Sequence, residues 1–216
     1  SVCWGNYSKT PAGSKLYGDN MRFIYLALIV AVLSFQATAN SGQFVQPNNL
    51  YPKVKLLTSQ GDIIVELDRS RAPITVNNFL TYVKQQSYNN TLFHRLEPEF
   101  VLQGGGYDIN YKPIEEHKSI FNESGNGLKN QIGTIAMARL NDPHSATSQF
   151  FFNLQDNSHL DPGRSWGYAV FGYITEGQDV IEKIRAIQTD TSVELGWPNV
   201  PVEKVVLKTV IVLPEQ

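Results

Sequence analysis

The stretch "FHRLEPEFVLQGGG", residues 93–106, decides how this chain folds and raises the question of what it does. Its two halves, rich in aromatic and aliphatic residues on either side of the turn-forming "EPE", predict two strands. Arg95 lies among five large apolar side chains, and the apolar run then stops at three consecutive glycines. A plain core strand does not need an arginine, and a plain surface strand does not need so many apolar residues. The stretch therefore raises the question of what chemistry would want a guanidinium beside an apolar pocket with bare backbone next to it. Taken alone, Arg95 would more often be a charge on a surface strand.

The segments on either side predict one hairpin and two helices. Two apolar runs separated by Ser59-Gln60-Gly61 predict a hairpin over residues 54–68. Residues 72–86 open with a proline near the first turn and carry apolar residues three or four positions apart, which predicts an amphipathic helix. Residues 177–187 have the same spacing and predict a second helix.

The remaining apolar segments predict further strands. Residues 132–139, 148–154 and 167–174 each read as one strand, and residues 200–213 as a closing strand or a pair of strands. Residues 107–131 are polar and loop-like. About eight strands with hairpin-type links and two helices predict a mainly β fold, a closed eight-stranded antiparallel barrel capped by two α-helices. Closure removes the exposed edges that such strands would otherwise leave.

The composition is that of an ordinary globular protein. The chain has 216 residues, of which 42% are hydrophobic and 18% charged, and the formal net charge is −2. This length fits one domain, or one domain with extensions. Because the net charge is small, nothing global points to nucleic acid or to an anionic membrane surface as a partner.

The N-terminal segment of the chain predicts export. Residues 21–39 combine a short positive start, a run of 13 apolar residues and the small residues of "ATA", the pattern of a signal peptide cleaved after Ala39. A membrane anchor and a buried helix are the alternatives, but an anchor needs about 20 apolar residues. Residues 1–20 read as an unstructured upstream extension and residues 40–52 as a flexible lead-in. Residues 53–214 are the expected folded domain, with no stable membrane association after cleavage.

The sequence lacks the motifs of several common chemistries. The four histidines are scattered without a metal-binding pair, and the single cysteine, Cys3, lies in the upstream extension. There is no G-x-S-x-G nucleophile motif and no phosphate-binding loop. We therefore expect neither a metal nor another cofactor. What remains is catalysis by binding, or binding alone.

Three motifs, "FHRLEPEFVLQGGG", "MAR…TSQFFFNL" and "YAVFGYI", resemble those of the cyclophilin family of peptidyl-prolyl cis-trans isomerases. The likeness runs from about Val54 to Leu213 and is strongest to the periplasmic, rotamase A type cyclophilins of Gram-negative bacteria. It implies a capped eight-stranded barrel and an isomerase that acts on X-Pro bonds.

 The implied partners are unfolded or partly folded exported proteins and Pro-containing peptides, the implied location is the periplasm, and the expected state is a monomer without a cofactor.

The resemblance also implies a set of site residues. Arg95 matches the catalytic arginine, and Gln103 matches the glutamine that orients it and contacts substrate. Val101 stands where many relatives have methionine, and Arg139 stands where many have asparagine, in a segment whose backbone pairs with the residues before proline. The substrate-binding positions carried over are Phe100, Val101, Ala138, Arg139, Gln149, Phe151, Leu160, His159 and Tyr168.

Two positions depart from the best-known members of the family. His159 stands where those members have a tryptophan that binds cyclosporin, and Tyr168 stands where they have a histidine at the pocket rim. Both changes leave Arg95 and the apolar pocket in place, so the sequence predicts an active isomerase that binds cyclosporin weakly. The alternative function is a non-catalytic chaperone or binding protein of the same fold that grips Pro-containing segments.

Overall fold

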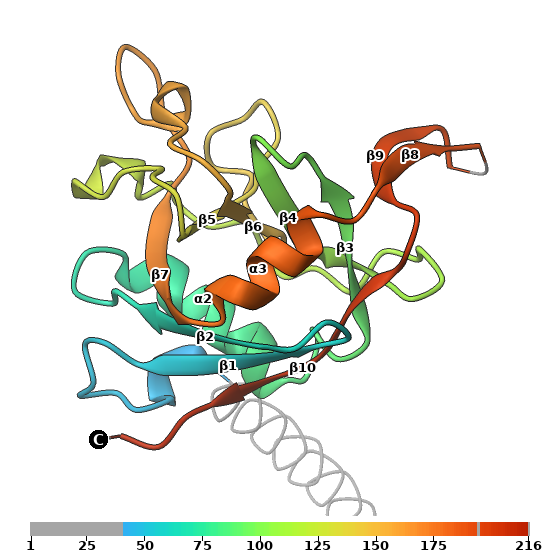
Figure 1. Cartoon of the computed structure of the whole chain (residues 1–216). Coiled ribbons are helices and arrows are strands. Elements are labelled where there is room, and N and C mark those ends of the chain that lie inside the picture. Colours follow the sequence, from blue (N-terminus) through green and yellow to red (C-terminus); the bar gives the residue numbers. More distant parts are fainter. Residues whose placement is uncertain (1–40, 194, 216) are drawn as a thin grey trace, which may run out of the picture. The chain divides into compact units, whose positions relative to one another are not determined.

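Eight strands form a closed barrel in the computed structural model, which describes residues 41–193 and 195–215. Around the barrel the order is β1-β10-β3-β4-β6-β5-β7-β2, and every neighbouring pair is antiparallel (Figure 1). This confirms the predicted fold class. The upstream extension and the signal peptide predicted over residues 1–39 lie outside the described residues. Within the described residues, no helix has the length and apolar character needed to cross a membrane.

The barrel strands follow the predicted segments closely. Their bounds are β1 Lys53–Thr58, β2 Asp62–Leu67, β3 Thr91–Leu96, β4 Val101–Asp108, β5 Thr134–Met137, β6 Phe150–Asn153, β7 Val170–Glu176 and β10 Val205–Val212. A short 3-10 turn, η1 Gly42–Phe44, lies before β1, and two more, η2 Ser124–Asn126 and η3 Ser158–Leu160, lie in connections between strands.

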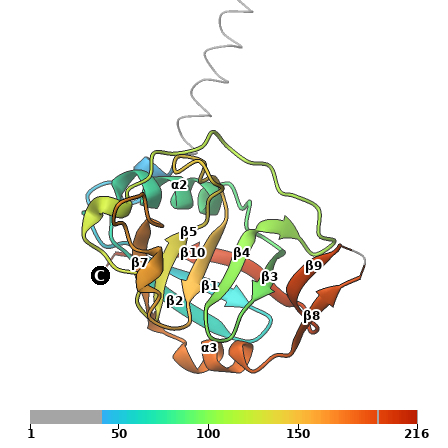
Figure 2. The same ribbon diagram turned by 90° about the horizontal axis from the view of Figure 1, so that it is seen from above.

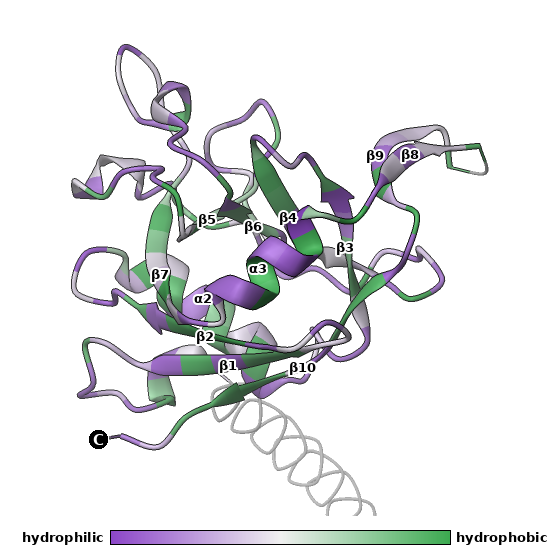
Figure 3. Cartoon of the chain, viewed as in Figure 1, coloured by the Kyte–Doolittle hydropathy of each residue, from purple (hydrophilic) through white to green (hydrophobic). Residues whose placement is uncertain are grey.

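Two helices cover the barrel from opposite sides (Figure 2). Helix α2, Pro73–Lys84, begins with its proline in the first turn, where the missing N–H has no partner to lose. Helix α3, Gln178–Arg185, begins after Gly177, whose positive φ of 93° suits glycine. It buries an apolar face and leaves a polar face outside, visible as alternating colours in Figure 3.

The interior of the barrel is filled by aromatic and branched side chains. Phe79 of α2 packs against Tyr88, Phe150 and Phe171, with ring centroids between 5.2 and 5.5 Å apart. Phe150 and Phe152 are fully buried in this core, while Phe151 between them faces the other side of the sheet. The period of two along β6 thus divides the molecule into a core inside the barrel and a second apolar cluster outside it.

A two-stranded hairpin outside the barrel is not predicted by the sequence. It consists of β8, Thr189–Ser192, and β9, Trp197–Pro201, and it stands to the side of β3 and β4 (Figure 1). The segment is polar and interrupted by prolines and a glycine, so its alternation is too weak to indicate strands. The region predicted as one closing strand or a pair is therefore the end of this hairpin followed by β10.

The lead-in over residues 41–52 is bound to the barrel, which differs from the flexible segment that its composition suggests. The guanidinium of Arg69, only 7% exposed, donates hydrogen bonds to the carbonyls of Gln46, Asn49 and Val45 at 2.6–2.8 Å. Gly42 is buried against α2, where its N–H donates to the Thr81 hydroxyl at 2.7 Å. The composition of residues 41–52 indicates only a weak local preference for regular structure. The segment is ordered by Arg69, which follows it in the chain.

Candidate active site

The registers of four strands place the central site residues in one row across the outside of the barrel. Arg95 of β3 pairs with Gln103 of β4, Gln103 pairs with Phe151 of β6, and Phe151 pairs with Ala136 of β5. Residues directly opposite in antiparallel strands point to the same face and touch. Residues far apart in the chain therefore meet along a single line, with the cation at one end and apolar side chains at the other.

A β-bulge turns Arg95 toward this row. Phe93 pairs with Gly104 and faces the core, and two residues later Arg95 pairs with the next residue back, Gln103. The extra residue is His94. Without it, the period of two would place Phe93 and Arg95 on the same face and bury the guanidinium in the barrel. The bulge re-aims one side chain, as bulges beside functional sites often do.

The apolar end of the row is a pocket of about 310 Å³. A small cluster separate from the barrel core forms its floor, and loops after β5 and β6 supply its far wall. Nine of the eleven predicted site residues line it: Arg95, Phe100, Val101, Gln103, Ala138, Arg139, Phe151, Leu160 and Tyr168. The Phe151 and Tyr168 rings meet edge to face at 5.7 Å, so Tyr168 belongs to the wall as the resemblance implied.

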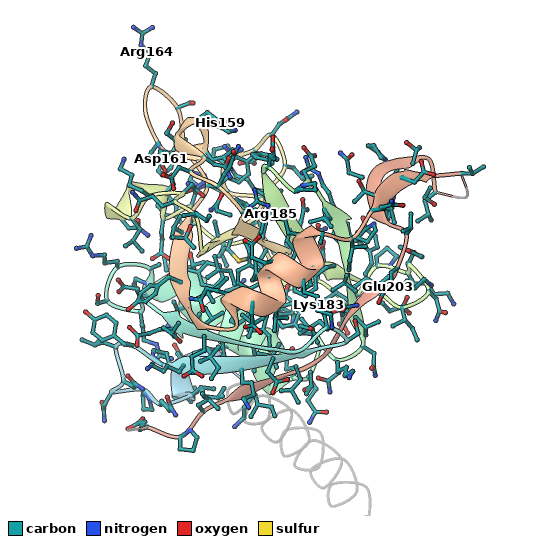
Figure 4. All side chains as sticks on the ribbon, viewed as in Figure 1. His159, Asp161, Arg164, Lys183, Arg185 and Glu203 are labelled. Atoms are coloured by element: carbon teal, nitrogen blue, oxygen red, sulfur yellow. The ribbon has the colours of Figure 1, made fainter. Side chains whose placement is uncertain are left out.

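The other two predicted residues lie beside the pocket. Gln149 lines an adjoining hollow of about 150 Å³ and accepts a hydrogen bond from Gln103 at 2.9 Å. His159 is exposed and does not line the pocket; its ring stacks on the outer side of Phe100, with centroids 5.5 Å apart. Figure 4 shows it in the loop above the barrel. It therefore affects the pocket through Phe100 or through a ligand that extends past the rim.

The consecutive glycines of β4 make room for the side chains around them. A Cβ on Gly106 would lie 2.6 Å from the Gln149 side chain, and a Cβ on Gly105, whose φ is +78°, would lie 2.8 Å from the ring of Phe150. Real Cβ contacts are never this close, so larger residues would displace Gln149 from the site or Phe150 from the core. The bare backbone in the opening motif is a packing requirement of both faces of the sheet.

Arg95 is held by a network that the sequence predicts only in part. Its Nη1 donates to Gln103 Oε1 at 3.2 Å, as expected for an orienting glutamine. Its Nε and Nη2 both donate to Glu97 Oε1, at 3.0 and 2.5 Å. The contact between Glu97 and Arg95 is not predicted from the sequence, because Glu97 stands in the polar "EPE", where a carboxylate is typical of a turn. The available signal is the Arg-x-Glu spacing, since residues two apart on a strand share a face.

A guanidinium has five N–H donors, and Arg95 donates three of them to Glu97 and Gln103. The other two donors have no hydrogen-bond partner among the described residues, which leaves them for a ligand in the neighbouring pocket. The side chain is 39% exposed, so a bound ligand that covers it would strengthen any hydrogen bond it makes. Chemically, the arrangement offers an oriented cationic donor beside a surface that fits a compact apolar ring.

Arg139 has a larger role than the backbone contact that the resemblance implies. Its guanidinium donates to the carbonyls of Gly167, Trp166 and Leu140 at 2.8–3.2 Å and lies 4.5 Å from the centre of the Tyr168 ring. The side chain thus connects the loop after β5 with the loop before β7. A long polar side chain in a loop carries no sequence signal for such a contact.

The fold and this groove define a class: a closed, helix-capped antiparallel barrel with an arginine beside an external apolar pocket. The family model for cyclophilin type peptidyl-prolyl cis-trans isomerases matches residues 53–212, and the chain belongs to this family. It is 44% identical to peptidyl-prolyl cis-trans isomerase A of Dickeya dadantii over 85% of this chain and 94% of the relative. It is 45% identical to peptidyl-prolyl cis-trans isomerase B of Escherichia coli over 72% and 96%.

The solved structures agree at the level of the fold. A cyclophilin type isomerase from Cryptosporidium parvum superposes with a TM-score of 0.64 at 23% identity, covering 77% of this chain and 99% of the other. This likeness shows the barrel fold, and the family match and the relatives at 44–45% identity show that the chain is a peptidyl-prolyl cis-trans isomerase.

Proposed function

We propose that this enzyme accelerates X-Pro isomerisation by holding the proline ring in the apolar pocket while Arg95 donates a hydrogen bond to the prolyl nitrogen. The observation that carries the proposal is the row of side chains across the sheet, which sets the guanidinium next to the pocket with two donors unused. Phe100, Val101, Phe151 and Leu160 would hold the ring while the other side of the bond turns.

The physical basis is a difference between ground state and transition state. Rotation about the peptide C–N bond costs about 18–20 kcal/mol because it breaks amide resonance. In the planar ground state the nitrogen lone pair is delocalised and does not accept a hydrogen bond, but in the twisted state it does. A donor fixed at that nitrogen therefore binds the transition state more strongly than the substrate, which is the condition for a faster reaction. Arginine suits the role because it stays charged and presents a rigid set of donors.

Replacing the arginine tests the mechanism. We expect Arg95→Ala to lower kcat/KM for a proline-containing peptide about 10²–10³-fold, the scale of one lost transition-state donor. Cooperative unfolding should persist, because the guanidinium lies outside the core. The measurement is a protease-coupled peptide assay on the chain from Asn40 to Gln216. Activity equal to wild type would refute the role of Arg95, and a wild-type chain that binds such peptides without turning them over would favour the chaperone alternative.

The clients are proposed to be unfolded or partly folded exported polypeptides in the periplasm, met by a monomer. The signal-like residues 21–39 support this, together with the similarity to peptidyl-prolyl isomerase A of Dickeya dadantii. Protein recovered from a Gram-negative host should begin at or near Asn40. A membrane-bound form that keeps residues 21–39 would speak for the anchor instead.

Weak cyclosporin binding is proposed from His159. The histidine ring stacks on Phe100 at the outer side of the pocket wall, where a tryptophan would present a wider apolar face and an indole N–H. We expect His159→Trp to tighten cyclosporin by about 1–3 kcal/mol, the scale of one aromatic contact at a hot spot, with little change in peptide turnover. Inhibition curves for both forms measure this. Equal inhibition constants would remove His159 from the drug-facing rim.

A further inference from the structure

The hairpin outside the barrel reaches the site through one hydrogen bond. Asn199 of β9 donates from Nδ2 to Glu97 Oε1 at 3.0 Å. The same oxygen accepts both bonds from the Nε and Nη2 of Arg95. One carboxylate oxygen of Glu97 therefore joins the hairpin to the Arg95 guanidinium. Because three N–H groups donate to this oxygen, its position relative to the guanidinium is restricted.

Asn199 keeps this contact in an unfavourable backbone conformation. Its φ is +60°, in the left-handed region where a residue with a Cβ is less stable than glycine. Glycine at this position would relieve the strain but could not donate to Glu97. The asparagine thus has a side-chain contact that offsets its backbone cost, and strained residues of this kind are common beside functional sites.

The hairpin is docked firmly enough to hold that contact. The Trp197 ring packs on Tyr107 of β4 with centroids 4.7 Å apart, and it meets His94 of β3 edge to face at 6.1 Å. Val200, next to Asn199, is buried. The contacts fall on the two strands that carry Arg95 and Gln103, so the hairpin and the catalytic row form one packed unit.

We propose that Glu97 and Asn199 are positioning residues that fix one edge of the Arg95 guanidinium so that its remaining donors face the pocket. The proposal rests on the catalytic role proposed above for Arg95. A long side chain that must be ordered at each turnover loses entropy, and one that is already ordered does not. Exposed ion pairs contribute little to stability, so the contact should act on turnover rather than on folding.

The test uses Asn199→Gly, which removes the amide and the left-handed strain together. The thermal midpoint should stay the same or rise, while kcat falls about 3–10-fold with KM nearly unchanged, because orientation of a transition-state donor is lost. If Asn199 had a purely structural role, the thermal midpoint would fall and kcat would stay at the wild-type value. The matched control is Asn90→Gly: Asn90 also has a positive φ, of 55°, but lies at the far end of β3. It should show the same change in midpoint and wild-type turnover.

Variants of Glu97 test in a second way whether the contact orients the Arg95 guanidinium or only stabilises the fold. Glu97→Leu should lower kcat about tenfold or more, and Glu97→Gln, which keeps an acceptor oxygen, should restore most of it. The Arg95 Nε–H NMR signal, assigned by its loss in Arg95→Lys, should move and exchange faster with water in Asn199→Gly as the side chain gains freedom. Wild-type kcat and an unchanged Arg95 signal in Asn199→Gly, with Arg95→Ala inactive, would overturn the positioning role alone. Full activity of Arg95→Ala would overturn the proposed mechanism with it.

Discussion

His94, the bulge residue beside Arg95, links the site to the acid sensitivity of the fold. The ring is 8% exposed, packs against Tyr107 and Trp197, and has an Nδ1 with no hydrogen-bond partner among the described residues. Burial lowers the pKa of His94 to about 4, and the charge of Arg95 acts in the same direction. The folded protein therefore keeps the His94 imidazole neutral at pH values where the unfolded chain is already protonated.

This burial predicts a loss of stability on acidification. The unfolded chain takes up the proton near pH 6.5 and the folded chain only near pH 4, so unfolding is favoured progressively as the pH falls between these values and no further below them. Between pH 7 and pH 5 His94 should remove about 2 kcal/mol from the free energy of unfolding. His94→Phe keeps a ring in the site and should lose less over this interval. Urea titrations at both pH values measure it, and parallel losses in the two proteins would contradict the assignment.

The pocket residues are predictable from the sequence, and part of the network around Arg95 is not. Phe100, Val101 and Phe151 occur in long motifs whose order and spacing are specific to one family. The bulge at His94 and the bond from Asn199 to Glu97 depend on strand register and on a hairpin that is far away in the sequence. Period-two alternation, the main strand signal, assigns Phe93 and Arg95 to one face and thus fails at the residue on which the site depends.

The loops around the groove depend on single contacts as much as on strands. The Arg139 guanidinium holds the carbonyls of Trp166 and Gly167 and covers the Tyr168 ring, which forms one wall of the pocket. Helices and barrel strands are recognisable from periodicity because many residues repeat one pattern. A connection between two loops made by one side chain has no such pattern, which is why Arg139 is predicted only for its backbone.

Removing this connection should loosen the wall without unfolding the barrel. We expect Arg139→Ala to raise KM for proline peptides about 3–10-fold, with hydrogen exchange faster over residues 161–168 and global stability within about 1 kcal/mol of wild type. Arg164→Ala is the matched control, because Arg164 lies on the loop before β7 that Arg139 holds and points away from the protein (Figure 4). Equal effects of the two substitutions would mean that loss of charge, and not of the connection, is responsible.

At the scale of the whole molecule, the lead-in over residues 41–52 is packed on the closed barrel, although its composition alone predicts a flexible segment. Carbonyls of residues 42–49 surround the buried guanidinium of Arg69, whose pKa is lowered by burial. Asn77 of α2 accepts its Nε–H at 3.1 Å. The proposed cleavage after Ala39 would leave these contacts in place, since among the described residues Gly42 is the first that Arg69 contacts. The folded unit therefore includes the lead-in over residues 41–52.

A double-mutant cycle tests whether Arg69 and the lead-in stabilise the fold together. In the chain from Asn40, Arg69→Met leaves several buried carbonyls without a donor and should cost about 2–4 kcal/mol of the free energy of unfolding. Starting the chain at Tyr51 removes those carbonyls and exposes Arg69 to water. In that shorter chain, Arg69→Met should cost less than about 1 kcal/mol, because the carbonyls it would leave unpaired are gone. Denaturant titrations of the four chains give the coupling energy. If both costs are equal, the lead-in lies on the barrel without contributing to its stability, and a flexible segment describes it better.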